Sequence, residues 1–208
     1  MQLLALTLMD IPQNFDWDRL PEFRLSALNQ LRPVDPNNVV RAQYDVYKDE
    51  VGNTNSNVET FVAIELVSDQ PNWQGTPIKL ITGKSMSKKT TEIRINLKKT
   101  HDSQSNCIVL GIQPNEGIDI QLFIKKPGYS REFETHHLSF NYPEGAKLPD
   151  AYEQVIVDAI SSRKSLFTSS EEVLQSWRIL QPIQDEWKNS QTPLKMYQKG
   201  ADITTVLA

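Results

Sequence analysis

The chain has 208 residues, of which 38% are hydrophobic, so it can form one large domain or two small ones with a normal buried core. Its net charge is −4 and its Lys and Arg residues are spread along the sequence, which argues against nucleic acid or an anionic membrane as the main partner. The longest apolar stretch, residues 3–9, is far shorter than the roughly 20 residues that span a bilayer, and no secretory signal is recognisable. We therefore expect a cytoplasmic protein. Cys107 is the single cysteine and cannot form an internal disulfide, which fits a reducing compartment.

Two helices are predicted before the first strand. Residues 1–9 are strong helix formers without a capping residue before them, and Pro12 should end this helix. We interpret residues 1–12 as the end of a truncated longer helix, with a natural frayed terminus as the alternative. The second helix is predicted over residues 16–31, where Pro33 stops the apolar periodicity.

The middle of the chain has the period of β-strands. In residues 93–97 and 118–124, apolar side chains alternate with polar ones, which places the two sets on opposite faces of half-buried, antiparallel strands. Residues 113–117 contain a proline and a glycine and predict the turn of a hairpin. Further strands are predicted at residues 39–47, 60–67, 78–81, 107–112 and 132–140.

After residue 149 the apolar spacing becomes helical again. A first helix should bury an apolar face made of Tyr152, Val155, Ile156, Ala159 and Ile160. A second helix should begin at Ser169, which has capping-box spacing to Glu172, and should kink at Pro182. Its predicted inner face consists of Val173, Trp177 and Leu180.

These elements predict an α+β fold in which a large, mainly antiparallel sheet has helices packed on one face. Residues 13–187 should form a single domain of this kind, and residues 188–208 a polar tail. The uncovered face of the sheet must then meet water or another subunit. Its polar residues are Glu92, Arg94, Asn96, Asp119 and Gln121.

Six short segments carry the most specific signal. They are residues 38–44 (NVVRAQY), 59–61 (ETF), 82–84 (TGK), 112–117 (IQPNEG), 148–153 (LPDAYE) and 176–182 (SWRILQP). Any one of them could arise by chance. Together and in this order they resemble the second half of the glucose-6-phosphate dehydrogenase family, and residues 2–12 resemble the helix end that precedes it.

The resemblance implies a subunit in which an amino-terminal Rossmann domain binds NADP, a large antiparallel sheet forms the dimer contact, and glucose 6-phosphate lies between the domains. The family oxidises this sugar phosphate to its lactone in the first step of the pentose phosphate pathway. The present sequence has no GxGxxG fingerprint and lacks the family's RIDHYLGK motif and its general-base histidine. We therefore expect no catalytic, cofactor-binding or metal-binding residue here, and no turnover by this chain alone.

Lys84 and Lys89 are the predicted substrate-binding residues. Lys84 follows Gly83 at an expected strand-to-loop transition, and Lys89 is five positions further on. Two ammonium groups can hold a phosphate as point charges, and glycine lets the backbone turn tightly. The resemblance matches Lys84 to a lysine that contacts the sugar phosphate and places Lys89 at a second basic contact. From the pattern alone, a solvated lysine cluster is the alternative.

Other polar and sulfur-containing residues are expected to be structural. His136 and His137 are neighbours in a predicted strand and point to opposite faces, so they cannot easily bind one metal, and His101 lies in a polar loop. Cys107 should be a small core residue.

Two further interpretations concern the strands. Arg41, Gln43 and Tyr44 alternate with apolar neighbours and are interpreted as a sheet face that meets a partner. Gly111 stands where vertebrate-type members of the family have an arginine for a second, structural NADP, so that site is not expected.

The resulting hypothesis is the carboxy-terminal, substrate-binding and dimerisation domain of a glucose-6-phosphate dehydrogenase. It should bind glucose 6-phosphate weakly and form a homodimer through its sheet. The alternative is a non-catalytic regulatory module that pairs with a full-length subunit. Native mass spectrometry of a mixture with the full-length enzyme distinguishes the two, because only the alternative requires mixed dimers.

Overall fold

The computed structural model describes residues 1–99, 105–143, 151–190 and 192–208. The chain divides into two compact units, one formed by Met1–Ser87 with Pro149–Ala208 and the other by Lys88–Leu148. The strands pair mainly antiparallel and the described helices belong to the first unit, so the predicted α+β class is confirmed. The strands form two four-stranded sheets, and the division between residues 87 and 88 falls inside the single domain expected over residues 13–187. Within the described ranges, no helix has the length and apolar composition to cross a membrane.

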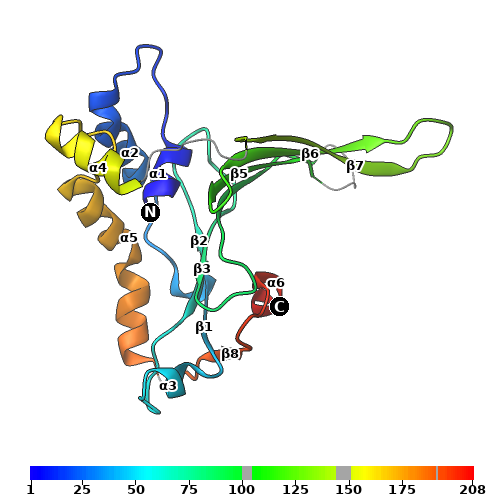
Figure 1. The fold of residues 1–208 in the computed structure, drawn as a ribbon. Coiled ribbons are helices and arrows are strands. Elements are labelled where there is room, and N and C mark those ends of the chain that lie inside the picture. The colour runs from blue at the N-terminus through cyan, green and yellow to red at the C-terminus, as the bar shows by residue number, and fades with distance from the viewer. Residues whose placement is uncertain (100–104, 144–150, 191) are drawn as a thin grey trace. The chain divides into compact units, whose positions relative to one another are not determined.

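The first unit is built on a sheet with the strand order β3-β2-β1-β8 (Figure 1). Its strands are β1 (Val39–Tyr44), β2 (Phe61–Leu66), β3 (Ile78–Gly83) and β8 (Lys195–Tyr197). β1 and β3 pair antiparallel with β2, whereas β8 pairs parallel with β1. Because side chains alternate along a strand, β2 contributes Ile64 and Leu66 to one face and Phe61 to the other.

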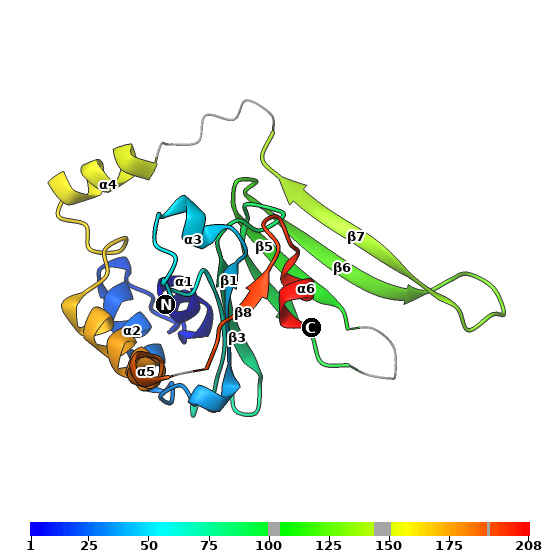
Figure 2. The same ribbon diagram turned by 90° about the horizontal axis from the view of Figure 1, so that it is seen from below.

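Three helices cover the face that carries Ile64 and Leu66 (Figure 2). They are α1 (Gln2–Leu8), α2 (Leu20–Asn29) and α5 (Ser170–Asn189). Leu4, Leu28 and Ile179 from these helices are buried in one cluster with the strand residues. Burying such a side chain contributes about 1.5–3 kcal/mol, so this cluster holds the helices on the sheet.

The first unit has further helical segments before α5. They are η1 (Trp17–Arg19), η2 (Pro36–Asn38), α3 (Tyr47–Glu50) and α4 (Ala151–Ile160). The helix predicted over residues 16–31 is divided into η1 and α2, because Arg19 departs from helical geometry (φ −93°, ψ 1°) and Pro21 stands in the first turn of α2, where its missing N–H is tolerated. The apolar face predicted for α4 is exposed at Tyr152 and Ile160, and its buried side chain is Asp158.

The buried face of α5 differs from the predicted one. Glu172 and Ile179 are each 1% exposed, whereas Val173 and Trp177 are 43% and 51% exposed. An ion pair between Arg24 of α2 and Glu172 directs this side of the helix inwards. The prediction from apolar spacing was therefore wrong for Val173 and Trp177, whereas Leu180 is partly buried and packs against the core as predicted.

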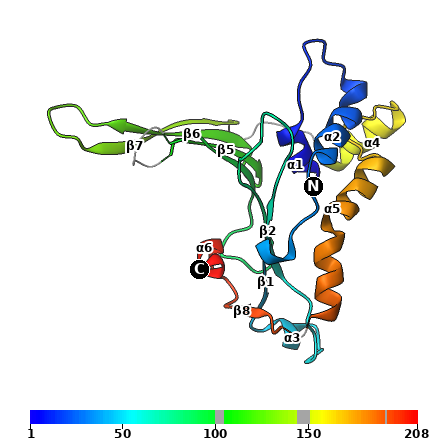
Figure 3. The same cartoon turned by 180° about the vertical axis from the view of Figure 1, so that it is seen from behind.

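The described residues that follow α5 form a strand and a helix, in place of the polar tail expected over residues 188–208. β8 extends the sheet, and α6 (Ile203–Leu207) lies on the face opposite to α5 (Figure 3). Tyr197 and Val206 are buried there with Ala42, Tyr44 and Phe61. A three-residue strand and a five-residue helix are too short to show a period in the sequence, which explains why they escape a periodicity argument.

The second unit consists of a sheet with the strand order β4-β5-β6-β7. Its strands are β4 (Thr91–Asn96), β5 (Cys107–Gln113), β6 (Gly117–Lys125) and β7 (Phe133–Asn141). All three strand pairs are antiparallel, and the predicted hairpin joins β5 to β6. Ile118 lies opposite Phe140 and Ile120 opposite Leu138, so these four side chains share one face.

Candidate functional site

Lys84 directly follows the last residue of β3, where the sequence predicted a strand-to-loop transition. Its backbone N–H donates to the carbonyl oxygen of Thr60 (2.8 Å), and its side chain is exposed. A Cβ at Gly83 would lie 2.7 Å from Cδ2 of the buried Phe61 and 2.8 Å from Sδ of Met86. Glycine therefore allows the backbone before Lys84 to pack directly on the core.

A chain of hydrogen bonds reaches the backbone of Lys84 from the neighbouring strands. The N–H of Tyr44 donates to Oγ1 of Thr60 (3.0 Å), so the Thr60 hydroxyl can donate its own proton to the phenolic oxygen of Tyr197 (2.9 Å). The Tyr197 hydroxyl in turn donates to the carbonyl oxygen of Lys84 (2.7 Å). Burial raises the pKa of Tyr197, against the lowering effect of the bond with Thr60, so the phenol keeps its proton at neutral pH.

The loop that follows β3 is bonded to the last part of the chain. Ser85 has a φ of 51°, in the left-handed region, and its carbonyl oxygen accepts from the N–H of Gly200 (2.7 Å). The N–H of Ser87 donates to the carbonyl oxygen of Ala201 (3.0 Å), and the Ser87 hydroxyl donates to the carboxylate of Asp202. The loop thus has a defined backbone conformation, held by residues far from it in sequence.

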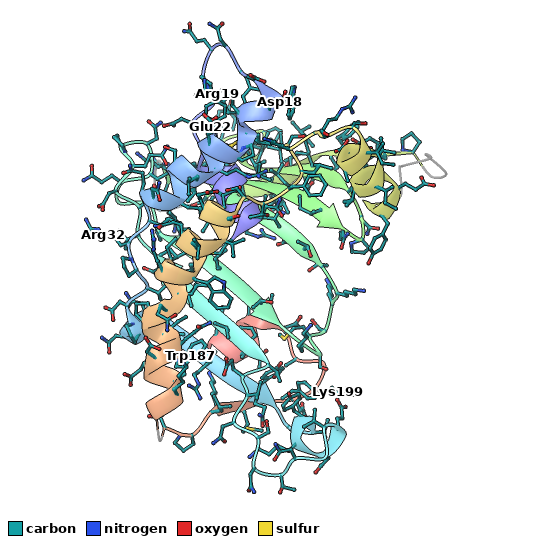
Figure 4. The ribbon with its side chains drawn as sticks, turned by 90° about the vertical axis from the view of Figure 1, so that its left-hand side faces the viewer. Asp18, Arg19, Glu22, Arg32, Trp187 and Lys199 are labelled. Atoms are coloured by element: carbon teal, nitrogen blue, oxygen red, sulfur yellow. The ribbon has the colours of Figure 1, made fainter. Side chains whose placement is uncertain are left out.

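Lys199 lies in the same C-terminal region, and its charge is paired (Figure 4). Its Nζ lies 2.5 Å from Oε1 of Glu50, and the hydroxyl of Tyr44 donates to Oε2 of the same carboxylate (2.6 Å). The hydrogen bonds from Lys199 and Tyr44 lower the pKa of Glu50, and the carboxylate in turn raises the pKa of Lys199. Neither Lys84 nor Lys89 forms an ion pair with another described residue. Their ammonium groups are therefore available to an anionic ligand.

The two predicted substrate-binding lysines belong to different units. Lys84 ends the sheet of the first unit, whereas Lys89 lies just before β4 in the second. Both side chains are exposed. A joint contact of the two lysines with one phosphate stays a prediction.

The histidine pair is bonded to carboxylates on the sheet of the second unit. Nε2 of His136 lies 2.7 Å from Oε1 of Glu134, and Nδ1 of His137 lies 2.9 Å from Oδ2 of Asp119. Asp119 also accepts from Ser139, and these bonds, led by the one from Ser139, lower its pKa. In the part of the chain that is described, no group of three or more His, Cys, Asp and Glu could hold a metal. His101 lies outside the described residues.

Arg41, Gln43 and Tyr44 are engaged within the first unit, which corrects their interpretation as a face that meets a partner. Gln43 is fully buried, and its amide donates to two backbone carbonyls in the loop before β2 (2.8 and 3.2 Å). The guanidinium of Arg41 lies 5.2 Å from the ring centroid of Trp187. Figure 4 labels Trp187, which belongs to α5. Strand β1 is thus covered on both faces.

The surroundings of Gly111 and the pairing of the described strands bear on nucleotide binding. A Cβ at Gly111 would lie 2.5 Å from the backbone oxygen of Asn115, so an arginine there would have to displace the hairpin turn. Apart from β1 with β8, the described strand pairs are antiparallel, and none belongs to a βαβ unit with a glycine-rich turn. Such a turn is what brings backbone N–H groups against a pyrophosphate.

Residues 84–87, which follow β3, are called the lysine loop from here on. Sequence reasoning missed Thr60, Tyr197 and Asp202 as neighbours of this loop. Thr60 is 8% exposed and Tyr197 is 6% exposed, and their hydroxyls meet across 137 positions of sequence. The only signal in the sequence is a tyrosine in a short apolar cluster, Met196 and Tyr197, inside an otherwise polar stretch.

Comparison with known proteins gives the same family over nearly the whole chain. The profile described as glucose-6-phosphate dehydrogenase, C-terminal domain, matches residues 1–205. The glucose-6-phosphate 1-dehydrogenase of Chlamydia trachomatis is 32% identical over 96% of this chain and 51% of its own length. That of Gluconobacter oxydans is 31% identical over 97% of this chain and 46% of its own length. The chain thus spans about half the length of the curated relatives that it matches.

Solved structures agree with this assignment. One described as glucose-6-phosphate dehydrogenase in complex with its substrate glucose-6-phosphate has a TM-score of 0.83 and 27% identity, covering 96% of this chain and 45% of that one. The glucose-6-phosphate 1-dehydrogenase of Mycobacterium avium has a TM-score of 0.81 and 28% identity, covering 96% and 44%. The fold, the segment order and the profile match agree, and the chain belongs to the glucose-6-phosphate dehydrogenase family, as a match to its C-terminal domain.

Proposed function

We propose that this chain is the substrate-binding and dimer-forming part of an enzyme in which NADP oxidises glucose 6-phosphate to 6-phosphogluconolactone. The match to the family's C-terminal domain over residues 1–205 carries the proposal. The relative with a TM-score of 0.83 is described as a complex with glucose 6-phosphate, which supports this substrate. NADP is assigned to a coenzyme domain that these 208 residues do not contain.

The role proposed for Lys84 is to bind the phosphate group of the sugar. Its ammonium is exposed and has no carboxylate partner among the described residues. Its backbone N–H and its carbonyl oxygen are both hydrogen-bonded. A fixed backbone with a free ammonium suits a phosphate, which accepts charge-assisted hydrogen bonds from lysine. Lys89 is proposed as a second contact with the same group.

The chemical step requires groups beyond this chain. Oxidation of the sugar needs a hydride acceptor close to the reacting carbon and a base within hydrogen-bond reach of the hydroxyl proton. The sequence has no GxGxxG fingerprint that would hold such a hydride acceptor. The chain incubated with NADP and glucose 6-phosphate should therefore produce no NADPH, and clear turnover would contradict this division of roles.

We propose that the sheet β4-β5-β6-β7 forms a two-fold dimer contact. Its exposed apolar side chains include Ile118 (42%), Leu138 (59%) and Phe140 (55%), which lie near one another on β6 and β7. An apolar patch of this kind is typical of an interaction surface, and a two-fold axis lets one patch pair with its own copy. Replacing Leu138 by Glu should convert a dimer into a monomer in sedimentation equilibrium. Even a weakly associating dimer should form at a chain concentration of about 100 µM. A native chain that is still monomeric there would exclude this contact.

We also place the protein in the cytoplasm. Cys107 is buried and unpaired, which agrees with a reducing compartment. Fractionation of the source cells is the direct test.

The substrate contact is tested by titrating the chain with glucose 6-phosphate and following its amide resonances. Lys84→Ala should raise the Kd about tenfold, because one charge-assisted hydrogen bond contributes about 1.5–3 kcal/mol. Lys79→Ala is the matched control. Lys79 is an exposed lysine on β3, the strand that Lys84 follows, and its Nζ lies 3.7 Å from Oε2 of Glu65. Equal affinities of Lys84→Ala and the native chain would refute the contact, and glucose without phosphate should bind to neither.

A further inference from the structure

We propose that residues 195–202 act as a C-terminal clamp that positions Lys84 for the substrate phosphate, with Tyr197 as its central positioning residue. The inference rests on the proposed contact between Lys84 and glucose 6-phosphate, and it identifies what keeps that lysine in place. Tyr197 and Lys84 are 113 positions apart in the sequence, and their hydrogen bond is 2.7 Å long. The clamp therefore contacts the lysine loop only in the folded chain.

The clamp contacts the lysine loop at three of four successive residues. The carbonyl oxygens of Lys84 and Ser85 accept from Tyr197 and Gly200, and Ser87 is bonded through both its N–H and its hydroxyl. Ser85 has a φ of 51°, a left-handed conformation that is unfavourable for an ordinary residue and persists only where neighbours hold it. The bonds from the clamp compensate for this cost.

Tyr197 is itself held firmly, so its hydroxyl has a defined position. Its ring packs edge-on against Tyr44 and Phe61, with centroid distances of 6.1 and 6.0 Å. The Thr60 hydroxyl accepts from the N–H of Tyr44 and has its own proton to give to Tyr197. The single proton of Tyr197 then points to the carbonyl oxygen of Lys84 (2.7 Å), with the carbonyl oxygen of Thr60 as a longer second acceptor (3.3 Å).

This arrangement matters for binding because Lys84 has a long, flexible side chain. If the backbone at its base moved, the ammonium would sample a larger volume, and more conformational entropy would be lost on binding the phosphate. A clamped backbone lowers that cost. The clamp should therefore affect affinity although none of its residues needs to contact the ligand.

The test compares the native chain with Tyr197→Phe, which removes one hydroxyl and keeps the ring. Tyr47→Phe is the matched control, because the Tyr47 ring packs against Tyr44 at 5.4 Å in the same aromatic cluster but makes no bond to the loop. Hydrogen exchange of single amides should be about tenfold faster in Tyr197→Phe at Lys84 and Ser87, as expected from the loss of one buried hydrogen bond. The control should leave these rates within about twofold of the native chain.

A purely structural role for the hydroxyl would predict a different result. Amide hydrogen exchange would then become faster at all slowly exchanging core residues, including those of β2. The increase at the lysine loop would be no larger than the increase elsewhere. The clamp predicts a change confined to residues 84–87 and their hydrogen-bond partners at 60, 200 and 201. Ser87→Ala loosens the other end of the loop and serves as a second variant if Tyr197→Phe does not fold.

Titration with glucose 6-phosphate completes the test. Tyr197→Phe should raise the Kd about threefold to tenfold, as loss of one hydrogen bond of about 1 kcal/mol predicts, and the control should not change it. Unchanged exchange at Lys84 would overturn the clamp. Faster exchange with unchanged affinity, while Lys84→Ala still weakens binding, would overturn the positioning role and leave the substrate contact intact. If Lys84→Ala has no effect on affinity, the substrate contact itself fails, and the exchange rates still report on the clamp.

Discussion

The buried ion pair between Arg24 and Glu172 should be the contact of the first unit that is most sensitive to substitution. Both side chains are 1% exposed, and Nε of Arg24 lies 2.6 Å from Oε1 of Glu172. Arg24 also donates to the carbonyl oxygens of Ser165 (2.7 Å) and Phe167 (2.5 Å). Glu172 accepts from the N–H of Ser169 (2.8 Å) and completes the predicted capping box. The pair therefore connects α2, α5 and the segment before α5.

The cost of breaking this pair follows from its burial. Glu172→Gln keeps the shape and the capping contact but leaves the guanidinium of Arg24 without a counter-charge in the core, which costs about 3–5 kcal/mol. Arg24→Met leaves the carboxylate without its counter-charge and two carbonyl oxygens without the donors from Arg24, at a similar cost. Replacing both residues by Met should cost less than the sum of the single changes, because no buried charge is left.

Urea unfolding followed by far-UV circular dichroism measures these costs as changes in the free energy of unfolding. Glu22→Gln is the control, since Glu22 forms an exposed pair with Arg19 at 2.9 Å, with side chains 56% (Arg19) and 63% (Glu22) exposed (Figure 4). An exposed pair contributes only about 0–1 kcal/mol. If Glu172→Gln destabilised the chain no more than Glu22→Gln, the reasoning from burial would be refuted.

Two further substitutions test other parts of the structure. Gly83→Ala should lower the free energy of unfolding by about 1–3 kcal/mol, because the added Cβ meets the fully buried ring of Phe61; an unchanged urea midpoint would contradict this. Ser139→Ala should raise the pKa of Asp119 towards the ordinary aspartate value of about 3.9, as measured by carboxyl NMR titration. Since a lowered carboxyl pKa stabilises the fold above the ordinary value, Ser139→Ala should destabilise at neutral pH, and the effect should fade as acid protonates Asp119; a pH-independent effect would contradict the linkage.

Local patterns in the sequence were sufficient to predict most of the elements. The strand predicted at residues 118–124 is β6, Gly117–Lys125, because one face of it is apolar and period two is unambiguous there. The start of α5 was predicted from Ser169 and Glu172 alone, since a capping box satisfies its own backbone groups whatever surrounds it. Lys84 directly follows a strand, as predicted, although the strand was predicted to end at residue 81 and β3 ends at Gly83.

Features that depend on distant residues could not be predicted in this way. The inward side of α5 is set by Glu172, and a buried glutamate cannot be recognised before its partner, Arg24, is known to face it. The three residues of β8 become a strand only because β1 offers a free edge, with Gln43 opposite Met196. Sequence spacing contains no information about that pairing. The same limit explains why the two sheets were taken for one.

The lysine loop shows why these two kinds of information are both needed. Lys84 was predicted as a phosphate ligand from the family resemblance, because the pattern alone favours a solvated lysine cluster. Charge balance in three dimensions distinguishes it from Lys199, which lies in the clamp and is paired with Glu50 at 2.5 Å. The Glu50 carboxylate that pairs with Lys199 also accepts a hydrogen bond from Tyr44. The ammonium of Lys199 is therefore engaged in a structural contact. Lys84 keeps its charge unpaired among the described residues while its backbone is the more tightly bonded of the two, and that combination is what a binding residue requires.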